Sequence, residues 1–286
     1  MYDSFRRLKS WRGAPFLVRL RKDVMVYVRD PSKKFFHVVV ELKNTPGALH
    51  GLLGVLSELD LNILGSFSSV DGRSKVGIWS GFVEGSHHTV SEIRKKVSSS
   101  ELVVESLVTE SKDGLLVDRL HFPLSWGTGD RAFMGRAAYV AKMLSEIRER
   151  FGTGGEKIVY DEGYAWGKES WAEMTARMGG EFVLSNLENV MMLYQAQGWF
   201  KVERVERNER TGAVMVDASE NFECMGEKSK RPHSQFVRGH LAGAFTAILG
   251  TEMACVEKRC IAAGGRLCEF ALSPRPNGGA TTSRRP

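Results

Sequence analysis

Apolar and polar residues follow two different periods in the first half of the chain. Between Phe36 and Leu42 the residues alternate and are rich in β-branched side chains, which is typical of a strand. From Ala48 to Leu59 apolar residues recur at helical spacing, which predicts a helix with one buried face. Strands are also predicted from Asn62, around 76–82 and over 102–108, and a helix over 89–98. The order strand, helix, strand, strand, helix, strand indicates a ferredoxin-like α+β domain.

The second half is predicted to form a mixed α/β domain. Over 131–151 apolar residues recur at alternating spacings of four and three, and the glycines of 152–155 are expected to end this helix. The remaining expected elements are helices at 161–178, 182–197 and 235–249 and strands at 200–205 and 213–218.

The length of 286 residues, with 42% hydrophobic and 26% charged residues, suits two globular domains. No stretch has the roughly 18 apolar residues of a membrane span, and the basic N-terminus lacks the apolar centre of a signal peptide. We therefore expect a cytoplasmic protein with reduced thiols. The expected segments are a basic arm (1–34), a first domain (35–110), a linker (111–117), a second domain (118–272) and a disordered tail (273–286).

Positive charge is concentrated in the arm. Residues 1–34 contain ten Lys or Arg and three Asp, a net of +7, whereas the whole chain carries +6. Such an arm can bind nucleic acid through phosphate contacts. The alternative is a structured, solvated or intersubunit segment, because 16–20 and 24–28 have the pattern of short strands and no helix-turn-helix or metal-finger motif is present.

All four cysteines lie in the last quarter of the chain. Glu257, Cys260 and Cys268 combine a carboxylate with two thiols around a Gly-Gly turn, a donor set that suits a closed structural zinc site. The predicted fourth ligand is Cys224, with His233 and Cys255 as alternatives. The competing interpretations are buried free thiols, or a disulfide if the protein is exported.

The region from Phe236 to Phe270 resembles the C-terminal half of a 4-vinyl reductase domain. The resemblance rests on the motif from Phe236 to Gly243, the apolar run to Gly250, and then Glu257, Cys260 and Cys268-Glu-Phe. This small-molecule-binding fold is shared by phenol-sensing transcription activators, bacteriochlorophyll-pathway proteins and vesicle-tethering subunits. The resemblance extends over about 118–272. In zinc-bearing members the fourth ligand is a cysteine at the position that here falls at about Ser234, so Cys224 or His233 would have to replace it.

Aromatic and methionine side chains recur along the helices of the second domain. They are interpreted either as core or as the lining of a pocket for a small apolar or aromatic ligand. The candidate pocket residues are Trp166, Trp171, Met174, Tyr194 and Trp199.

The turn between the first predicted strand and helix carries an Asn-x-Pro-Gly-x-Leu motif, and this region resembles an ACT domain, a regulatory module of amino-acid metabolism. The resemblance implies that the turn and helix start bind the carboxylate of an amino acid, that Asn62 of a partner completes the pocket, and that the protein is a homodimer. The alternative is that the turn is only structural. The implied ligand-binding residues are Asn44, Thr45, Pro46, Gly47, Ala48, Leu49 and Asn62.

No arrangement of residues predicts catalysis. The seven histidines are scattered, no triad has recognisable spacing, and no nucleotide-binding motif is present. We therefore expect a ligand-sensing regulator rather than an enzyme. The alternatives are an enzyme or accessory protein that acts on a tetrapyrrole or aromatic substrate, and a nucleic-acid-binding regulator that uses the basic arm.

Overall fold

The computed structural model describes residues 22–70, 74–125 and 129–275, and these residues form two compact units that divide after residue 132. Among the described helices, none is long and apolar enough to cross a membrane.

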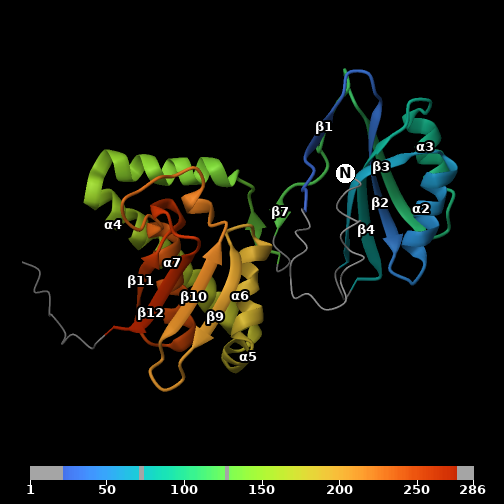
Figure 1. Ribbon diagram of the computed structural model, residues 1–286. Helices are drawn as coiled ribbons and strands as arrows, with labels where there is room; N and C mark the ends of the chain where they lie inside the picture. Colours follow the sequence, from blue (N-terminus) through green and yellow to red (C-terminus); the bar gives the residue numbers. More distant parts are fainter. Residues whose placement is uncertain (1–21, 71–73, 126–128, 276–286) are drawn as a thin grey trace, which may run out of the picture. The chain divides into compact units, whose positions relative to one another are not determined.

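The first unit is built on a four-stranded antiparallel sheet in the order β3-β4-β2-β5 (Figure 1). Helix α2 (Ala48–Glu58) and helix α3 (Val90–Val97) complete the order β2-α2-β3-β4-α3-β5, so the predicted ferredoxin-like fold is confirmed. The strands are β2 (Phe35–Lys43), β3 (Asn62–Val70), β4 (Val76–Glu84) and β5 (Val103–Glu110).

Alternate residues of β2 supply cores on both faces of this sheet. Phe36, Val38 and Val40 pack with Leu52 and Leu56 of α2, as the strand and helix periods predict. Helix α3 begins with a capping box in which Thr89 and Glu92 satisfy each other's backbone N–H groups.

The opposite face of the sheet is partly covered by β6 (Leu115–Val117), which pairs with β1 (Tyr27–Arg29). Leu116 is buried there with Phe35 and Phe82. Most of the expected linker belongs to this unit, because the apolar side chain of Leu116 is buried against the sheet. The end of the expected arm belongs to it as well, because β1 pairs with β6. A short ribbon, β7 (Leu124–Ser125) with β8 (Arg131–Ala132), follows. The strand expected at 16–20 lies outside the described residues.

The second unit is built on an antiparallel sheet in the order β11-β12-β10-β9, with α7 (Gln235–Leu249) and α4 (Ala137–Met178) as its long helices (Figure 1). Gly152 has the non-helical angles φ 57° and ψ −134°. The expected break occurs there, but the chain resumes the helix at once, so α4 is bent. The remaining elements are α5 (Gly180–Ser185), α6 (Leu187–Ala196), β9 (Lys201–Arg207), β10 (Val214–Ser219), η2 (Phe222–Cys224), β11 (Met253–Arg259), η3 (Ile261–Ala263) and β12 (Cys268–Pro274).

The expected tail began at 273, but the first two of its residues lie in β12. Residues 276–286 lie outside the described residues.

Helices α4 and α7 approach each other so closely that their contact requires glycine. A Cβ atom at Gly243 would overlap the backbone oxygen of Tyr164, and one at Gly167 would overlap the backbone oxygen of His240. Gly163 and Gly239 make equivalent contacts with the facing backbone. The two helices are therefore held in one relative position by backbone contact.

Gly243→Ala is expected to lower the free energy of unfolding of the second unit by about 2–3 kcal/mol, because the added methyl group must push two backbones apart. Calorimetric unfolding of the full chain measures it. Gly154→Ala is the matched control in α4, since a Cβ atom there has no neighbour within 4 Å. Equal effects of the two substitutions on the free energy of unfolding would contradict the inference that close backbone contact at Gly243 holds α4 against α7.

Candidate functional site

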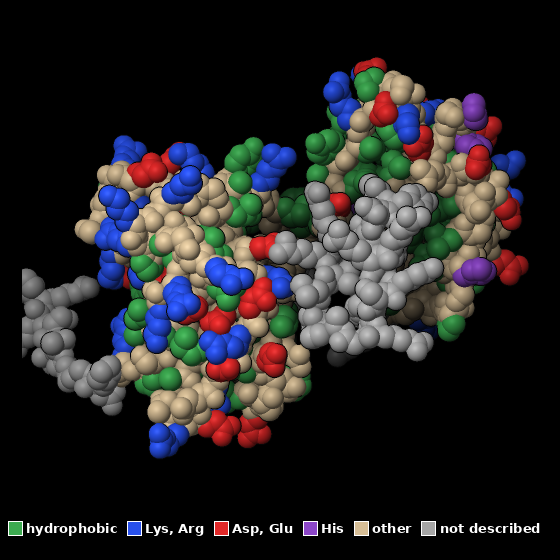
Figure 2. All heavy atoms as spheres, in the orientation of Figure 1, with side chains coloured by type: hydrophobic (Ala, Val, Ile, Leu, Met, Phe, Trp, Pro, Cys, Tyr) green, Lys and Arg blue, Asp and Glu red, His purple; other side chains and the backbone are tan. Residues whose placement is uncertain are grey.

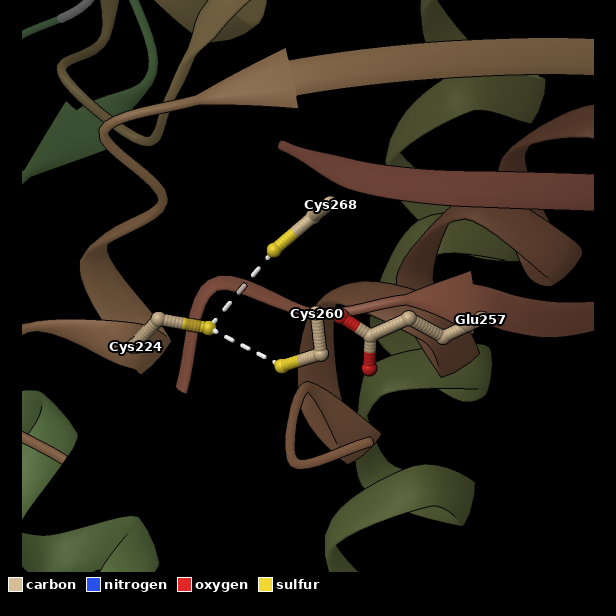
Figure 3. A group of neighbouring side chains, drawn as sticks. All are labelled: Cys224, Glu257, Cys260 and Cys268. Atoms are coloured by element: carbon tan, nitrogen blue, oxygen red, sulfur yellow. Dashed lines mark hydrogen bonds between the residues drawn. The ribbon is translucent and has the colours of Figure 1, made fainter. Parts of the chain in front are cut away.

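Four buried side chains in the second unit point toward a common centre: Cys224, Glu257, Cys260 and Cys268 (Figure 3). Cys224 ends η2, Glu257 lies in β11, Cys260 follows that strand, and Cys268 begins β12. One ligand atom from each lies within 4.8 Å of the others. The structure thus brings together the four residues predicted from the sequence, and this thiol cluster could hold a metal ion.

The spacing of the sulfurs in the thiol cluster suits a tetrahedral metal. Sγ of Cys224 is 3.6 Å from Sγ of Cys260 and 3.7 Å from Sγ of Cys268. Zn–S bonds of about 2.3 Å give a tetrahedron with edges of about 3.8 Å. A disulfide needs sulfurs about 2.05 Å apart, and all four cysteines are free.

Ser234 occupies the space beside the cluster. Its Oγ donates to Oε1 of Glu257 (2.9 Å) and lies 3.2 Å from Sγ of Cys224, while its backbone N–H donates to Oε2 of Glu257 (3.0 Å). Asn221 donates through Nδ2 to Oγ of Ser234 at 2.9 Å. Ser234 therefore lies where the resemblance places a fourth cysteine, and Cys224 presents its sulfur to the same space from η2.

Hydrogen bonds among the thiols and burial shift the pKa values of the residues in the thiol cluster. Hydrogen bonds from Cys224 and Cys268 lower the pKa of Cys260, and the bond to Cys260 raises the pKa of Cys224 to about 12. Burial, with a smaller effect of Cys260, raises the pKa of Glu257 to about 7. The raised pKa values of Cys224 and Glu257 disfavour complete ionisation of the cluster unless a cation is bound.

The two alternative fourth ligands lie outside the thiol cluster. Nε2 of His233 lies 2.9 Å from a guanidinium nitrogen of Arg148. Cys255 lies on the same strand as Glu257 but two residues earlier, which is roughly 7 Å along a strand. Of the three candidates, only Cys224 belongs to the cluster.

The predicted pocket residues lie in a packed aromatic cluster. Nε1 of Trp171 donates to the hydroxyl of Tyr194 (3.0 Å), and that hydroxyl lies 2.8 Å from Nδ1 of His240. The ring centroid of Trp199 lies 4.6 Å from that of His240 and 5.9 Å from that of Trp166. Met174 is among the partly buried residues packed against this core. These contacts give the residues a packing role, and their role in binding a ligand stays a prediction.

A pocket of about 660 Å³ lies elsewhere in the second unit, lined from α4, α7, β11 and the end of β12. Within it, Lys157 pairs with Asp161, and Arg275 pairs with Glu252. Its lining residues are Thr153, Glu156, Lys157, Tyr160, Asp161, Tyr164, Arg238, Glu252, Cys255 and Arg275. No local pattern in the sequence indicated this pocket, because its walls come from segments far apart in the chain.

Arg238 is the distinctive cation of that pocket. Its guanidinium lies 5.2 Å from the ring centroid of Tyr160, and its buried Nε has no hydrogen-bond partner within the described ranges. Burial raises the pKa of the Cys255 thiol and keeps it neutral. The pocket therefore combines aromatic and neutral surface with an arginine that is not ion-paired to any described carboxylate.

In the first unit, the predicted amino-acid site forms the turn from β2 into α2. Gly47 has φ 88° and precedes α2, which has no side-chain cap. Nδ2 of Asn44 donates to the backbone oxygen of Ser74 (3.1 Å). Thr45, Pro46, Gly47, Leu49 and Asn62 are exposed, whereas Ala48 is buried. The turn is built as expected, and ligand binding there stays a prediction.

Two family models each match part of one unit. Residues 36–101 match the family model of the ACT domain, and residues 214–274 match that of the 4-vinyl reductase domain. The chain contains an ACT domain and a 4-vinyl reductase domain. The two resemblances inferred from the sequence are confirmed over these residues, and the expected extension of the second one from 118 to 213 stays a prediction.

Solved structures similar to about half of the chain share little sequence with it. The phenol-responsive sensory domain of the transcription activator PoxR, solved with phenol, is 18% identical, with a TM-score of 0.42, and the match covers 52% of this chain and 79% of that one. A trafficking protein particle complex subunit 3 from Naegleria fowleri, covalently bound to palmitic acid, is 13% identical (TM-score 0.39; 49% and 95% covered). A vinyl-4-reductase family protein from Methanocaldococcus jannaschii is 16% identical (TM-score 0.31; 51% and 99% covered). No curated protein sequence matches the chain significantly.

Proposed function

We propose that the protein is a ligand-sensing regulator whose 4-vinyl reductase domain binds a small aromatic molecule in the pocket beside Tyr160. The observation that carries this proposal is the pocket itself, in which Tyr160 and Tyr164 offer ring surface and Arg238 offers a cation whose Nε has no hydrogen-bond partner among the described residues. Concave sites that combine aromatic surface with a few polar groups hold small ligands. Arg238 favours aromatic ligands that carry an acidic group, such as a carboxylate or a phenolate.

Arg238→Met is expected to weaken binding of benzoate about 10-fold to 100-fold and binding of neutral phenol much less, because a hydrogen bond to a charged group contributes about 1.5–3 kcal/mol. Isothermal titration calorimetry on the full chain measures both ligands. Arg210→Met, in an exposed turn, is the matched control.

The same titrations distinguish the two candidate pockets. Loss of binding in Trp166→Ala with no effect of Arg238→Met would move the ligand to the aromatic cluster. Failure of the wild-type chain to bind any aromatic acid or phenol would overturn the proposal.

The thiol cluster is proposed to hold a structural zinc ion. The three cysteines and Glu257 would supply all four ligands of such an ion and would leave no open position for a substrate water. This supports a regulatory rather than an enzymatic role. If a tetrapyrrole were handled, the purified protein would carry its colour.

The ACT domain is proposed to pair with a second copy and to bind an amino acid at that interface. Phe67, Ile78 and Leu107 are between 44% and 49% exposed. Phe67 pairs with Ser80 and Leu107 with Val39, and these partners also pair with each other, so Phe67 and Leu107 lie in one row across the sheet. Burying the exposed side chains of Phe67, Ile78 and Leu107 favours association. Native mass spectrometry of the full chain tests the dimer and reports bound metal and ligand together.

No specific observation favours nucleic-acid binding. Lys33 pairs with Glu84 and Lys34 with Glu110, and the other basic residues of the arm lie mostly in the undescribed range 1–21. On the visible face of the second unit, Lys and Arg side chains are interspersed with Asp and Glu (Figure 2).

A further inference from the structure

A second group of metal-ligand side chains lies in the ACT unit, far from the thiol cluster in sequence. His37 lies in β2, Asp118 is the first residue after β6, and His121 follows in the same segment. One ligand atom from each lies within 4.8 Å of the others. The pairing of β6 with β1, and the hydrogen bond from the Asp118 N–H to the Val26 oxygen (3.0 Å), hold this segment near the sheet.

His37 has an unsatisfied ring nitrogen inside this group. The side chain is 1% exposed, and its Nε2 lies 2.8 Å from Oγ of Ser80. Its Nδ1 has no hydrogen-bond partner among the described residues and faces Oδ1 of Asp118 at 3.8 Å. A buried ring nitrogen without a partner is costly, and 3.8 Å is too long for a hydrogen bond.

A metal ion satisfies this nitrogen with the observed spacing. If Nε2–H donates to Ser80, the Nδ1 lone pair points at an electron-rich carboxylate oxygen. Two metal–ligand bonds of about 2.1 Å span up to about 4.2 Å, so a cation can bind both atoms. A second hydrogen bond on the other ring nitrogen is typical of metal-binding histidines, and Ser80 is placed to accept it.

Asp118 and His121 form the other side of the group. Nδ1 of His121 lies 3.0 Å and 2.9 Å from the two carboxylate oxygens of Asp118, and its buried Nε2 has no partner in the described part of the chain. The ring centroid of Phe82 lies 4.6 Å from that of His37, and the ring centroid of Phe67 lies 5.0 Å from that of His121. Apolar rings therefore border the polar group on two sides.

The protonation states agree with this geometry. Burial lowers the pKa of His37 to about 4, so the ring is neutral near pH 7. Burial acts to raise the pKa of Asp118, but hydrogen bonds from Leu120 and His121 outweigh it and lower that pKa, so the carboxyl group is ionised. Metals bind neutral imidazole and ionised carboxylate.

We propose that His37, Asp118 and His121 bind a divalent transition-metal ion on the face of the ACT sheet opposite its helices. Two imidazoles and one carboxylate suit Zn²⁺ or Co²⁺ and leave a coordination position open. The ion ties the segment after β6 to the central strand β2. This site is independent of the thiol cluster, which lies in the other unit and uses mainly sulfur.

Cobalt binding to the full chain tests the proposal, because cobalt bound to thiolates has charge-transfer absorption that a nitrogen–oxygen site lacks. After chelation and reloading with Co²⁺, elemental analysis is expected to find one cobalt per chain more than the thiol cluster holds. His121→Gln and Asp118→Asn are expected to lose this one cobalt and keep the thiolate absorption. Cys260→Ser is expected to do the reverse.

Two further variants complete the experiment. His87→Gln, at an exposed histidine of the same unit, is expected to keep wild-type cobalt content. His37→Gln is expected to behave like His121→Gln, but the half-buried His121 and Asp118 carry the test because the buried His37 contributes to packing. Equal cobalt content in wild type, His121→Gln and Asp118→Asn would overturn the proposal, whatever the thiol cluster binds.

Discussion

Replacing Cys260 by serine is expected to abolish zinc binding at the thiol cluster and to lower the melting temperature of the second unit by roughly 10 °C. Free zinc at a thousandfold excess over its dissociation constant stabilises the bound fold by about 4 kcal/mol. For a domain of this size each kcal/mol shifts melting by about 2–4 °C. Serine cannot supply the thiolate. Zinc per chain and calorimetric melting in matched zinc concentrations are the measurements.

Cys255→Ala is the matched control, since Cys255 is buried and free but lies outside the cluster. This variant is expected to retain zinc at the wild-type ratio. If wild type and Cys260→Ser contain the same amount of zinc per chain and have the same melting temperature, the cluster is only a set of buried thiols.

A double variant, Cys224→Ser with Ser234→Cys, tests the position of the fourth ligand. Oγ of Ser234 lies 3.2 Å from Sγ of Cys224 and 2.9 Å from Oε1 of Glu257, so a sulfur at position 234 reaches the same centre. The double variant is expected to bind zinc, whereas Cys224→Ser alone is expected to lose it. Zinc retained in full by Cys224→Ser would exclude Cys224 as a ligand.

Glu223→Ala is expected to destabilise the second unit by about 3–5 kcal/mol, because it leaves the buried Arg148 without its counter-ion. Oε1 of Glu223 accepts from Arg148 at 2.6 Å and from the Phe236 N–H at 3.0 Å, and Oε2 accepts from the Val237 N–H at 2.9 Å. The carboxylate thus joins α4 to the start of α7. Chemical denaturation of the full chain measures the loss.

Two comparisons separate charge from packing at this pair. Replacing both partners, Arg148→Met with Glu223→Leu, is expected to cost less than Glu223→Ala alone, since no buried charge remains unpaired. Glu209→Ala, at an exposed turn, is expected to change stability little. A cost below about 1 kcal/mol for Glu223→Ala would show that the ion pair does not hold the two helices.

The sequence was most informative where the signal is local. Alternation in β2 and helical spacing in α2 identified the ferredoxin-like order, because both periods record which face of a single element is buried. Glu257, Cys260 and Cys268 lie within one β-hairpin, so their approach depends on a short turn. These features require no knowledge of distant partners.

Contacts between residues far apart in the sequence were determined only by the tertiary structure. The sequence left Cys224, His233 and Cys255 open as a fourth ligand, and the choice depends on how η2 packs beside the β11–β12 hairpin. The sequence also separated β6 from the ACT unit as a linker, although β6 pairs with β1, a strand that lies far before it in the chain.

His37 and His121 illustrate the same limit, since they appeared isolated in the sequence yet their ring centroids lie 5.3 Å apart. Residue periodicity reports burial along one element, whereas the contacts between elements depend on backbone packing that no local pattern contains. The sequence alone determined the two domain types and three of the four residues in the thiol cluster. Only the tertiary structure chose the fourth, placed the pocket around Arg238 and brought the two histidines to one carboxylate, because each requires side chains from segments far apart in the chain.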